Sequence, residues 1–447
     1  MIKLLKYIGC LISCLVISQC AFAYDFEDYG LYYNIVSSTE KTCGLAHVEK
    51  GIVAKYDGII TVPQTVTDKG ITYTVTQIQS NAFIQLNELK DVNIPKTVNS
   101  IGSRAFSQCS SLVQFIIPAH IETIGDYAFQ NCSRLEDVII EDSQNTLNLG
   151  LKVFYQTPVK YAYIGRSFTA KQEPYGYAES LIFQDSKSLK SIDFGKEVTS
   201  ISKYAFYGCQ FTTLSLPDNL TVISDDAFEN CWSLESVVLP SNLERIEWAG
   251  FRGCGKLVDI QFPKSLNYIG ADGFMDFAGE RIDLSETSLT IIESGAFRAC
   301  YNLKEIKLPE SLIEIGPTCF QSSQIYTITI PKNVQTIGGI AFNVCPNLET
   351  IYCLAETPPT TEESTFDQEA YEQATLYVPK GTKDLYSKKG AWKYFKTIQE
   401  IESATIESIT SNSQIPVYFD INGNVVSEPI ESRPIKSTKV KNTFIVL

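Results

Sequence analysis

The sequence is poor in histidine, since His47 and His120 are the only two among its 447 residues. Enzymes with a Ser-His-Asp or Cys-His arrangement need an imidazole held beside the nucleophile. Neither histidine belongs to such an arrangement or to a metal-ligand spacing, and His120 follows the proline of a predicted strand, so we interpret it as a solvated turn residue. Walker, Rossmann and EF-hand patterns are also missing. We therefore predict no catalytic residue, no metal site, no cofactor and no enzymatic activity.

Carboxylates are abundant, and a glycosidase needs only two of them at a suitable separation across a cleft. Close pairs such as Asp225 and Asp226, or Glu362 and Glu363, are interpreted as solvated turns. A glycan-active enzyme is therefore a distant alternative that would require convergent carboxylates in a deep, aromatic-lined cleft. A weak calcium site in an acidic turn also stays open.

Long apolar runs and basic clusters are lacking too. Beyond the N-terminus we find no stretch of roughly 18 uncharged apolar residues, so no membrane-spanning helix is predicted. The net charge is −14 and the Lys and Arg residues are scattered. Nucleic acid and anionic lipid would both be repelled, so neither is expected as a partner.

The N-terminus has the pattern of an export signal. Lys3 and Lys6 precede an apolar run from Tyr7 to Ile17, and Ala21-Phe22-Ala23 offers small residues for cleavage. Residues 1–23 are therefore predicted to be a signal peptide, and the mature chain is expected to be secreted or on the cell surface. Lipidation at Cys20 is an open alternative, although a bulky Gln precedes this cysteine.

Phenylalanine recurs along the chain at a step of 22 to 23 residues. Such a period is typical of a solenoid, in which each coil buries its apolar side only against its neighbours. The fold class that we predict is a repeat solenoid of about 23 residues per turn with parallel β-strands, a β-rich N-terminal cap and a small C-terminal β tail. The recurring residues, hereafter the ladder phenylalanines, are Phe83, Phe106, Phe129, Phe206, Phe228, Phe251, Phe274, Phe297, Phe320 and Phe342.

Each repeat predicts one strand and a second short inward segment. In Gln114–Ile117 the residues alternate, so Phe115 and Ile117 are expected to point inward and Gln114 and Ile116 outward. A proline then ends the strand, because proline cannot donate to a ladder hydrogen bond. An inward pair such as Val98 and Ile101 follows in each coil, and then a glycine, before the Ala-Phe pair.

Cysteine occupies a fixed position, three residues after a ladder Phe. Thirteen cysteines, less Cys10, Cys14 and Cys20 of the predicted signal, leave ten in the mature chain, and in an exported protein these would ordinarily indicate disulfides. Other coils place Leu86, Phe277 or Ser323 in the same position, so we expect buried free thiols that act as small apolar groups. An occasional bridge between stacked neighbours stays possible. The cysteines in this position are Cys109, Cys132, Cys209, Cys231, Cys254, Cys300 and Cys345.

The period breaks between Phe129 and Phe206, where 77 residues stand in place of the 69 that three units need. We predict degenerate coils around Phe154 and Phe183, with Gly165 to Glu179 as a protruding loop.

The domain boundaries that follow from these patterns are 1–23 for the signal, 24–77 for the N-terminal cap, 78–354 for the repeats (irregular at 141–195), 355–401 for a C-terminal repeat cap, and 402–447 for a linker and β tail.

Local patterns predict the elements of both ends. The cap strands are expected at Leu31–Val36, Ile59–Val62 and Ile71–Val75. The stack is expected to close with a final strand at Leu376–Pro379 and a helix at Lys383–Phe395. Beyond the linker, Val417–Val426 resembles a hairpin centred on Asn422-Gly423, and Thr443–Leu447 is expected to form a last strand. This tail is vaguely similar to the sorting modules of some exported bacterial proteins, although their usual glycine-rich final strand is missing.

The repeat resembles the bacterial surface antigen type of leucine-rich repeat, the BspA-like family, from roughly Ile71 to Ile401. A nearly complete example runs from Ile94-Pro95 through Ile101-Gly102 and Ala105-Phe106 to Cys109. The resemblance implies a parallel-strand solenoid and an exported or surface-located protein that binds a protein or a glycan. It supplies no catalytic residue.

Outward residues of successive strands form rows about 5 Å apart, so the sheet face is the candidate partner-binding surface. Ile116 and Ile139 would make an exposed apolar pair beside the irregular region. We predict a non-enzymatic recognition or adhesion protein; the alternative is a structural surface protein without a defined ligand. The residues predicted to bind the partner are Gln114, Ile116, Asp137, Ile139, Ser191 and Asp193.

Overall fold

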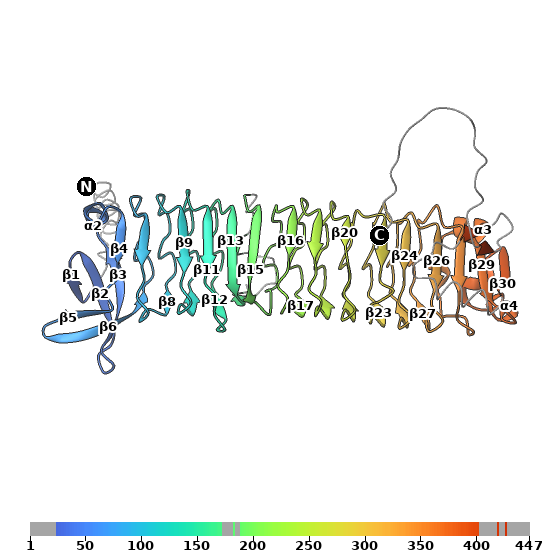
Figure 1. The fold of residues 1–447 in the computed structure, drawn as a ribbon, viewed down its shortest axis with the longest axis horizontal. Coiled ribbons are helices and arrows are strands. Elements are labelled where there is room, and N and C mark those ends of the chain that lie inside the picture. Colours follow the sequence, from blue (N-terminus) through green and yellow to red (C-terminus); the bar gives the residue numbers. More distant parts are fainter. Residues whose placement is uncertain (1–23, 172–181, 184–187, 402–417, 420–424, 427–447) are drawn as a thin grey trace, which may run out of the picture.

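The computed structural model describes residues 24–171, 182–183 and 188–401, with the strand residues 418–419 and 425–426. These residues form a stack of about 14 turns of about 23 residues, and successive coils lie side by side in chain order (Figure 1). Each regular coil has three sides: a long-strand side, a short-strand side and a turn side that carries the ladder Phe. The predicted repeat solenoid with parallel strands is confirmed.

The long-strand side alternates as the sequence predicts. In β9, Phe115 and Ile117 are buried, whereas Gln114 and Ile116 are exposed. Within five consecutive sheets, β4 with β7, β9 to β15, β16 to β20, β22 to β24 and β26 to β30, each strand pairs in parallel with the same strand of the next coil, so the inward residues form apolar rows. Its strands are β4 (Ile59–Thr61), β7 (Asp91–Asn93), β9 (Gln114–Ile117), β11 (Asp137–Ile140), β13 (Tyr161–Arg166), β15 (Ser191–Glu197), β16 (Thr213–Ser215), β18 (Ser236–Val238), β20 (Asp259–Ile260), β22 (Arg281–Asp283), β24 (Glu305–Lys307), β26 (Thr327–Ile330), β28 (Thr350–Cys353), β29 (Thr375–Pro379) and β30 (Thr397–Ile401).

The short-strand side contains the second inward segment of each coil. Val98 and Ile101 are both buried, and Ile101 pairs in register with Ile124 of the next coil. Its strands are β8 (Ser100–Ile101), β10 (Thr123–Ile124), β12 (Leu147–Leu149), β14 (Phe168–Ala170), β17 (Val222–Ile223), β19 (Arg245–Ile246), β21 (Tyr268–Ile269), β23 (Ile291–Ile292), β25 (Glu314–Ile315) and β27 (Thr336–Ile337).

The ladder phenylalanines form one stacked column through the turn side. Neighbouring ring centroids lie between 4.9 Å, for Phe83 and Phe106, and 6.0 Å, for Phe183 and Phe206. Phe154 and Phe183 continue the column through the region where the period breaks, as predicted. The column also extends to Phe366, which stacks on Phe342 at 5.4 Å and was not predicted. Its spacing of 24 residues and the missing Ala-Phe pair conceal it in the sequence.

The backbone of the turn side is left-handed on both sides of each ladder Phe. Around Phe106, for example, Arg104 has φ of 53° and Gln108 has φ of 63°. This conformation is uncommon for residues other than glycine, but here it aligns the Phe106 N–H with the Ala128 carbonyl of the next coil, at 2.8 Å. Backbone hydrogen bonds between coils therefore continue on the side that has no strand.

The ten cysteines from Cys43 to Cys353 are all free and buried. The Cys109 thiol donates to the carbonyl of Phe83 in the preceding coil at 3.0 Å, and the Cys132 thiol donates to Phe106 at 3.1 Å. Thr157 fills the same position in another coil, and its hydroxyl donates to the Phe129 carbonyl at 2.6 Å. Cysteine and threonine in this position thus link consecutive coils by a hydrogen bond, whereas Leu86 and Phe277 fill it without one. Burial raises the pKa of Cys132 to about 12.

A mixed sheet forms the N-terminal cap and continues into the short-strand side, through parallel pairing of β6 with β8. The strands predicted at Leu31–Val36, Ile59–Val62 and Ile71–Val75 correspond to β2, β4 and β6, whereas β3 and helix α2 were not predicted. Because β6 pairs with β8, the first coil has no free edge there. The cap elements are β1 (Phe26–Asp28), β2 (Leu31–Ser37), β3 (Thr42–Val48), α2 (Lys50–Lys55), β5 (Thr65–Asp68) and β6 (Ile71–Ile78).

The C-terminal end differs from the prediction in two ways. The helix predicted at Lys383–Phe395 is divided into α4 (Lys383–Tyr386) and the 3-10 helix η2 (Gly390–Tyr394), because Gly390 adopts φ of 52°. The last strand of the stack is β30, which follows the strand predicted at Leu376–Pro379. The remaining elements here are η1 (Glu363–Thr365) and α3 (Gln368–Gln373).

Trp392 closes this end of the stack. Its ring lies 5.5 Å from that of Phe366 and is fully buried, and its Nε1 donates to the Pro359 carbonyl at 2.9 Å. The aromatic column therefore ends against a bulky side chain and is not exposed to water.

The loop predicted at Gly165 to Glu179 is wrong in its first part. Gly165 lies in β13, and residues 168–170 form β14, so the chain stays in the stack as far as residue 171. The reason is that Phe168 is buried and β14 pairs with β12. Residues 172–181 lie outside the described residues, as do residues 1–23 with Cys20, the linker, the Asn-Gly turn and the last predicted strand. In the tail, β31 (Tyr418–Phe419) and β32 (Val425–Val426) pair antiparallel, as expected of the predicted hairpin.

Replacement of Phe251 tests the column. Its ring stacks between Phe228 and Phe274 at 5.3 Å on each side and is 1% exposed. Phe251→Ala should lower the free energy of unfolding by about 3 to 5 kcal/mol, because a cavity remains inside the stack. The control is Tyr301→Ala, at a side chain that is 64% exposed. Equal urea denaturation midpoints for the two variants would contradict the column.

Candidate recognition surface

Strands β9, β11, β13 and β15 form a continuous four-stranded parallel sheet on the long-strand side (Figure 1). Their register aligns the outward residues into two rows that cross all four strands. We call these eight residues the sheet patch. Its first row is Gln114, Asp137, Tyr161 and Ser191, and its second row is Ile116, Ile139, Tyr163 and Asp193.

The six residues predicted from the sequence thus lie on one face, but in two groups. Gln114, Ile116, Asp137 and Ile139 are contributed by adjacent strands, as expected. Ser191 and Asp193 lie one strand further away, because β13 runs between β11 and β15.

Tyr161 and Tyr163 fill the space between these groups, and the sequence analysis missed them as surface residues. The signal was present, since both tyrosines alternate with the buried Ala162 and Ile164. The missing proline and the broken period concealed the coil to which they belong.

The patch combines apolar surface with fixed polar groups. Ile116 is 47% exposed, and Ile139, Tyr161 and Tyr163 are half-buried around it. The Tyr161 hydroxyl donates to Asp193 Oδ2 at 3.0 Å. Burial, with a contribution from this hydrogen bond, raises the pKa of Tyr161, so its hydroxyl stays protonated near neutral pH.

A second hydrogen bond holds the other tyrosine of the patch. The Tyr163 hydroxyl donates to Asp142 Oδ1 at 2.9 Å. Both rings are thereby held on the sheet before any partner binds. Side chains that are already ordered lose less conformational entropy on binding.

A buried arginine anchors the edge of the patch. Arg166, at the end of β13, is fully buried, and its two Nη atoms donate to the carbonyls of Pro118 and Ala119 at 2.9 Å each. Burial lowers its pKa, an effect that the neighbouring Glu141 opposes. Glu141 in turn accepts from the Ala119 N–H at 2.9 Å. These contacts fix the turn after β9 across two coils, and a β-bulge follows Ile164.

The turn side carries two buried acidic residues, Asp226 and Glu229, and the sequence analysis placed the first of them in solvent. Asp226 is fully buried, whereas its neighbour Asp225 is half-buried and forms an ion pair with Lys203 at 3.2 Å. Glu229 is only 3% exposed. The interpretation of Asp226 as a solvated turn is therefore wrong, because its left-handed backbone lies inside the stack of turns.

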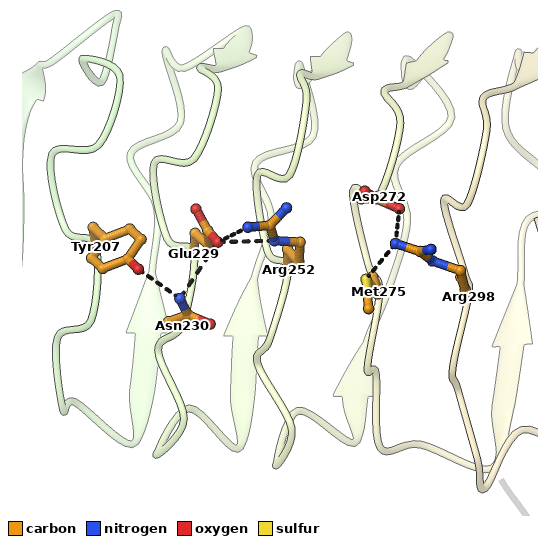
Figure 2. Close-up of polar contacts among 7 residues, drawn as sticks. All are labelled: Tyr207, Glu229, Asn230, Arg252, Asp272, Met275 and Arg298. Carbon is orange, nitrogen blue, oxygen red and sulfur yellow. Dashed lines mark hydrogen bonds and ion pairs between the residues drawn. The ribbon is translucent and has the colours of Figure 1, made fainter. Parts of the chain in front are cut away.

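The charges around Glu229 are paired along the stack (Figure 2). Arg252 Nε, from the next coil, donates to Glu229 Oε1 at 2.9 Å. Asn230 Nδ2 donates to the Tyr207 hydroxyl of the preceding coil at 2.9 Å. Two coils further on, Arg298 Nη2 donates to Asp272 Oδ1 at 3.2 Å, and Met275 lies beside this pair. These contacts link neighbouring coils.

The negative charge of a buried carboxylate is stabilised less at Asp226 than at Glu229, since no side chain makes a hydrogen bond of ordinary geometry to the Asp226 carboxylate. Burial first, and then the Glu229 carboxyl, raise the pKa of Asp226 to about 7, against the opposing effects of Tyr204 and Lys203. The two carboxyl groups are too buried to receive a glycan, so they do not support a glycosidase site.

Of the two histidines, the one that the sequence interpretation placed in solvent is more buried than expected. His120 is half-buried and not fully solvated, and burial lowers its pKa. His47 lies in β3, where burial also lowers its pKa. Across the part of the chain that the structure describes, no group of three or more His, Cys, Asp or Glu residues has the geometry of a metal site. In the same residues no helix is long and apolar enough to cross a membrane.

The repeat pattern decides the family. A family model described as BspA type leucine rich repeat region (6 copies) matches residues 64–175, 176–287 and 269–397. The chain belongs to the BspA type leucine-rich repeat family. The matches cover the BspA-type coils together with most of the C-terminal end of the stack, which confirms the resemblance. No curated protein matches the chain.

Solved structures similar to this BspA-type protein include three bacterial repeat proteins. A leucine-rich repeat protein from Bacteroides ovatus is 20% identical, covers 85% of this chain and 100% of its own, and gives a TM-score of 0.47. A leucine rich cell surface protein from Faecalibacterium prausnitzii is 20% identical, with coverages of 87% and 98% and a TM-score of 0.38. The pneumococcal vaccine antigen PcpA is 16% identical, with coverages of 84% and 98% and a TM-score of 0.38.

Asp226 predicts a pH dependence of stability. Its pKa is about 7 in the folded protein, against about 3.9 in an unfolded chain. Unfolding between these values releases a proton, so the contribution of Asp226 to stability falls as pH rises from about 4 to about 7 and stays low above that range. Asp226→Asn should therefore raise the midpoint of thermal unfolding more at pH 8 than at pH 5. The control is Asp218→Asn, at an exposed position; an equal shift at both pH values for Asp226→Asn would contradict the assignment.

Proposed function

We propose that this protein is exported to the cell surface, where it binds a partner macromolecule through the sheet patch without catalysing a reaction. Membership of the BspA type repeat family and the predicted signal at residues 1–23 support the location. A leucine rich cell surface protein and a vaccine antigen stand among the similar solved structures. The sorting role of residues 402–447 stays a prediction.

The observation that carries the binding role is the in-register patch on β9, β11, β13 and β15. Ile116, Ile139 and Tyr163 are consecutive in the second row, with Tyr161 beside them in the first. Gln114 and Asp137 lie next to the isoleucines in the first row, and Ser191 and Asp193 lie at the β15 end. Aromatic and apolar side chains next to polar ones are the usual composition of a protein interface. Tyrosine is also enriched among the residues that dominate binding energy.

A protein partner fits this surface better than a short glycan. The patch lies on the outer face of a parallel sheet, and its two rows run across four coils. Such a face grows with coil number and makes many modest contacts with an extended partner. Glycan binding to the same face is tested in parallel.

The experiment is a binding screen of the purified protein against host matrix proteins and a glycan array, followed by titration of each positive. Saturable binding is expected for at least one matrix protein. The double variant Ile116→Ser with Ile139→Ser should weaken that binding by about tenfold or more, since removal of a central apolar contact costs at least ~1 to 2 kcal/mol.

The matched control is Val238→Ser, because Val238 occupies the same outward row on β18 and is 64% exposed. This control should leave the affinity unchanged. Equal weakening by both variants, or unchanged binding by the double variant, would contradict the patch. If no probe binds saturably, the protein acts as a structural surface component without a defined ligand, and fractionation of the producing cell then tests its location alone.

A further inference from the structure

A furrow crosses the short-strand side next to the N-terminal cap. It has a volume of about 520 Å³, which lies inside the ~300 to 1,000 Å³ range of ligand sites. A second hollow of about 240 Å³ adjoins it and shares Ser80 and Ser103 with it. The furrow is lined by Gln77, Ile78, Gln79, Ser80, Ser100, Ile101, Gly102, Ser103, Thr123, Ile124 and Gly125, and the second hollow by Ser80, Asn81, Ser103, Arg104, Asp126 and Tyr127.

Two glycines of consecutive coils, Gly102 and Gly125, lie on the floor of the furrow. A Cβ atom at Gly102 would lie 2.4 Å from the Ser80 amide nitrogen, and one at Gly125 would lie 2.4 Å from the Ser103 amide nitrogen. Glycine therefore lets consecutive coils approach closely along the floor. The glycine recurs in the equivalent position of other coils, as Gly150, Gly270, Gly316 and Gly338, so the side chains of the walls distinguish this furrow.

The walls supply neutral hydrogen-bonding groups. Gln77, Ser100 and Thr123 align in register across β6, β8 and β10 and form one wall. Gln79 closes the end near the cap, and Asn34 Nδ2 holds it by donating to Gln79 Oε1 at 2.9 Å. Amide and hydroxyl side chains both donate and accept, and they carry no charge that would select an ion.

An aromatic ring with polar neighbours lies at the second hollow. Tyr127 is half-buried there; the Arg104 guanidinium lies over its ring, 5.6 Å from the centroid, and the Tyr155 ring is near-perpendicular to it at 6.2 Å. The Asp126 carboxylate is fixed by Lys171 at 3.2 Å and by the Leu151 N–H at 2.9 Å. The exposed part of an aromatic ring next to groups that donate and accept suits a ligand with alternating C–H and hydroxyl surfaces.

Other ligand classes fit less well. A peptide cannot join the floor by strand addition, because the central strands β8 and β10 are paired on both edges. An apolar ligand would find little surface, since Ile78, Ile101 and Ile124 are all at most 2% exposed.

We propose that this furrow, with the adjoining hollow, binds a short neutral oligosaccharide. The site lies on a different side of the coil from the sheet patch, so it does not depend on the function proposed above. The walls would recognise ring hydroxyls, and the exposed part of the Tyr127 ring would contact the sugar C–H groups.

The test uses four neutral trisaccharides as probes: maltotriose, cellotriose, mannotriose and triacetylchitotriose. Each is titrated into the purified protein to about 10 mM by calorimetry, with saturation-transfer NMR to detect contact. At least one probe should bind saturably, with a Kd below about 1 mM. Thr123→Trp should reduce this affinity by about tenfold or more, because the indole fills the furrow.

Thr336→Trp is the matched control, since Thr336-Ile337-Gly338 repeats Thr123-Ile124-Gly125 on a coil far from the cap. This control should bind the probe like the unchanged protein. If Thr123→Trp fails to fold, Gln77→Ala replaces it and should weaken binding by about 2- to 10-fold, the effect of one lost hydrogen bond. Saturable binding by none of the probes, or equal losses in the furrow variant and in Thr336→Trp, overturns the proposal.

Discussion

The fold depends on contact between successive coils, because no single coil can bury its own apolar side. One ladder Phe from each coil stacks on the next at 4.9 to 6.0 Å, and the Phe106 N–H reaches the Ala128 carbonyl of the following coil. Contact between coils also influences which residues occupy individual positions of the repeat. Cysteine suits its position because a small buried thiol donates to the carbonyl of a ladder Phe one coil earlier.

Because each coil packs only against its two neighbours, the side chains on the outer faces can differ from coil to coil. On the long-strand side this freedom produces the sheet patch, in which Tyr161 and Tyr163 are held by Asp193 and Asp142. On the short-strand side it produces the furrow beside the cap, where Gly102 and Gly125 lie on the floor. Both features lie in the N-terminal half of the stack, between the cap and β15.

The sequence predicted the strands and buried residues of the regular coils, and it missed residues in coils that depart from the repeat. Phe115 and Ile116 were assigned to opposite faces correctly, because alternation in a strand is a local rule. Phe366 and the two patch tyrosines were missed, since their coils depart from the period by which the others were aligned. Burial of Asp226 was also missed: a carboxylate beside a turn ordinarily faces water, and only the stacking of neighbouring turns encloses it.

The most direct test of a single continuous spine is hydrogen–deuterium exchange followed by mass spectrometry. The ladder amides are hydrogen-bonded to the following coil from Phe83 to Phe342 in the coils that the structure describes fully, as for Phe129 with Val153 and Phe206 with Ala227. We expect slow exchange in every peptide that contains such an amide, on both sides of the irregular region. Separate protected blocks, divided by a fast-exchanging segment at residues 141–171, would show independent globules and contradict the account.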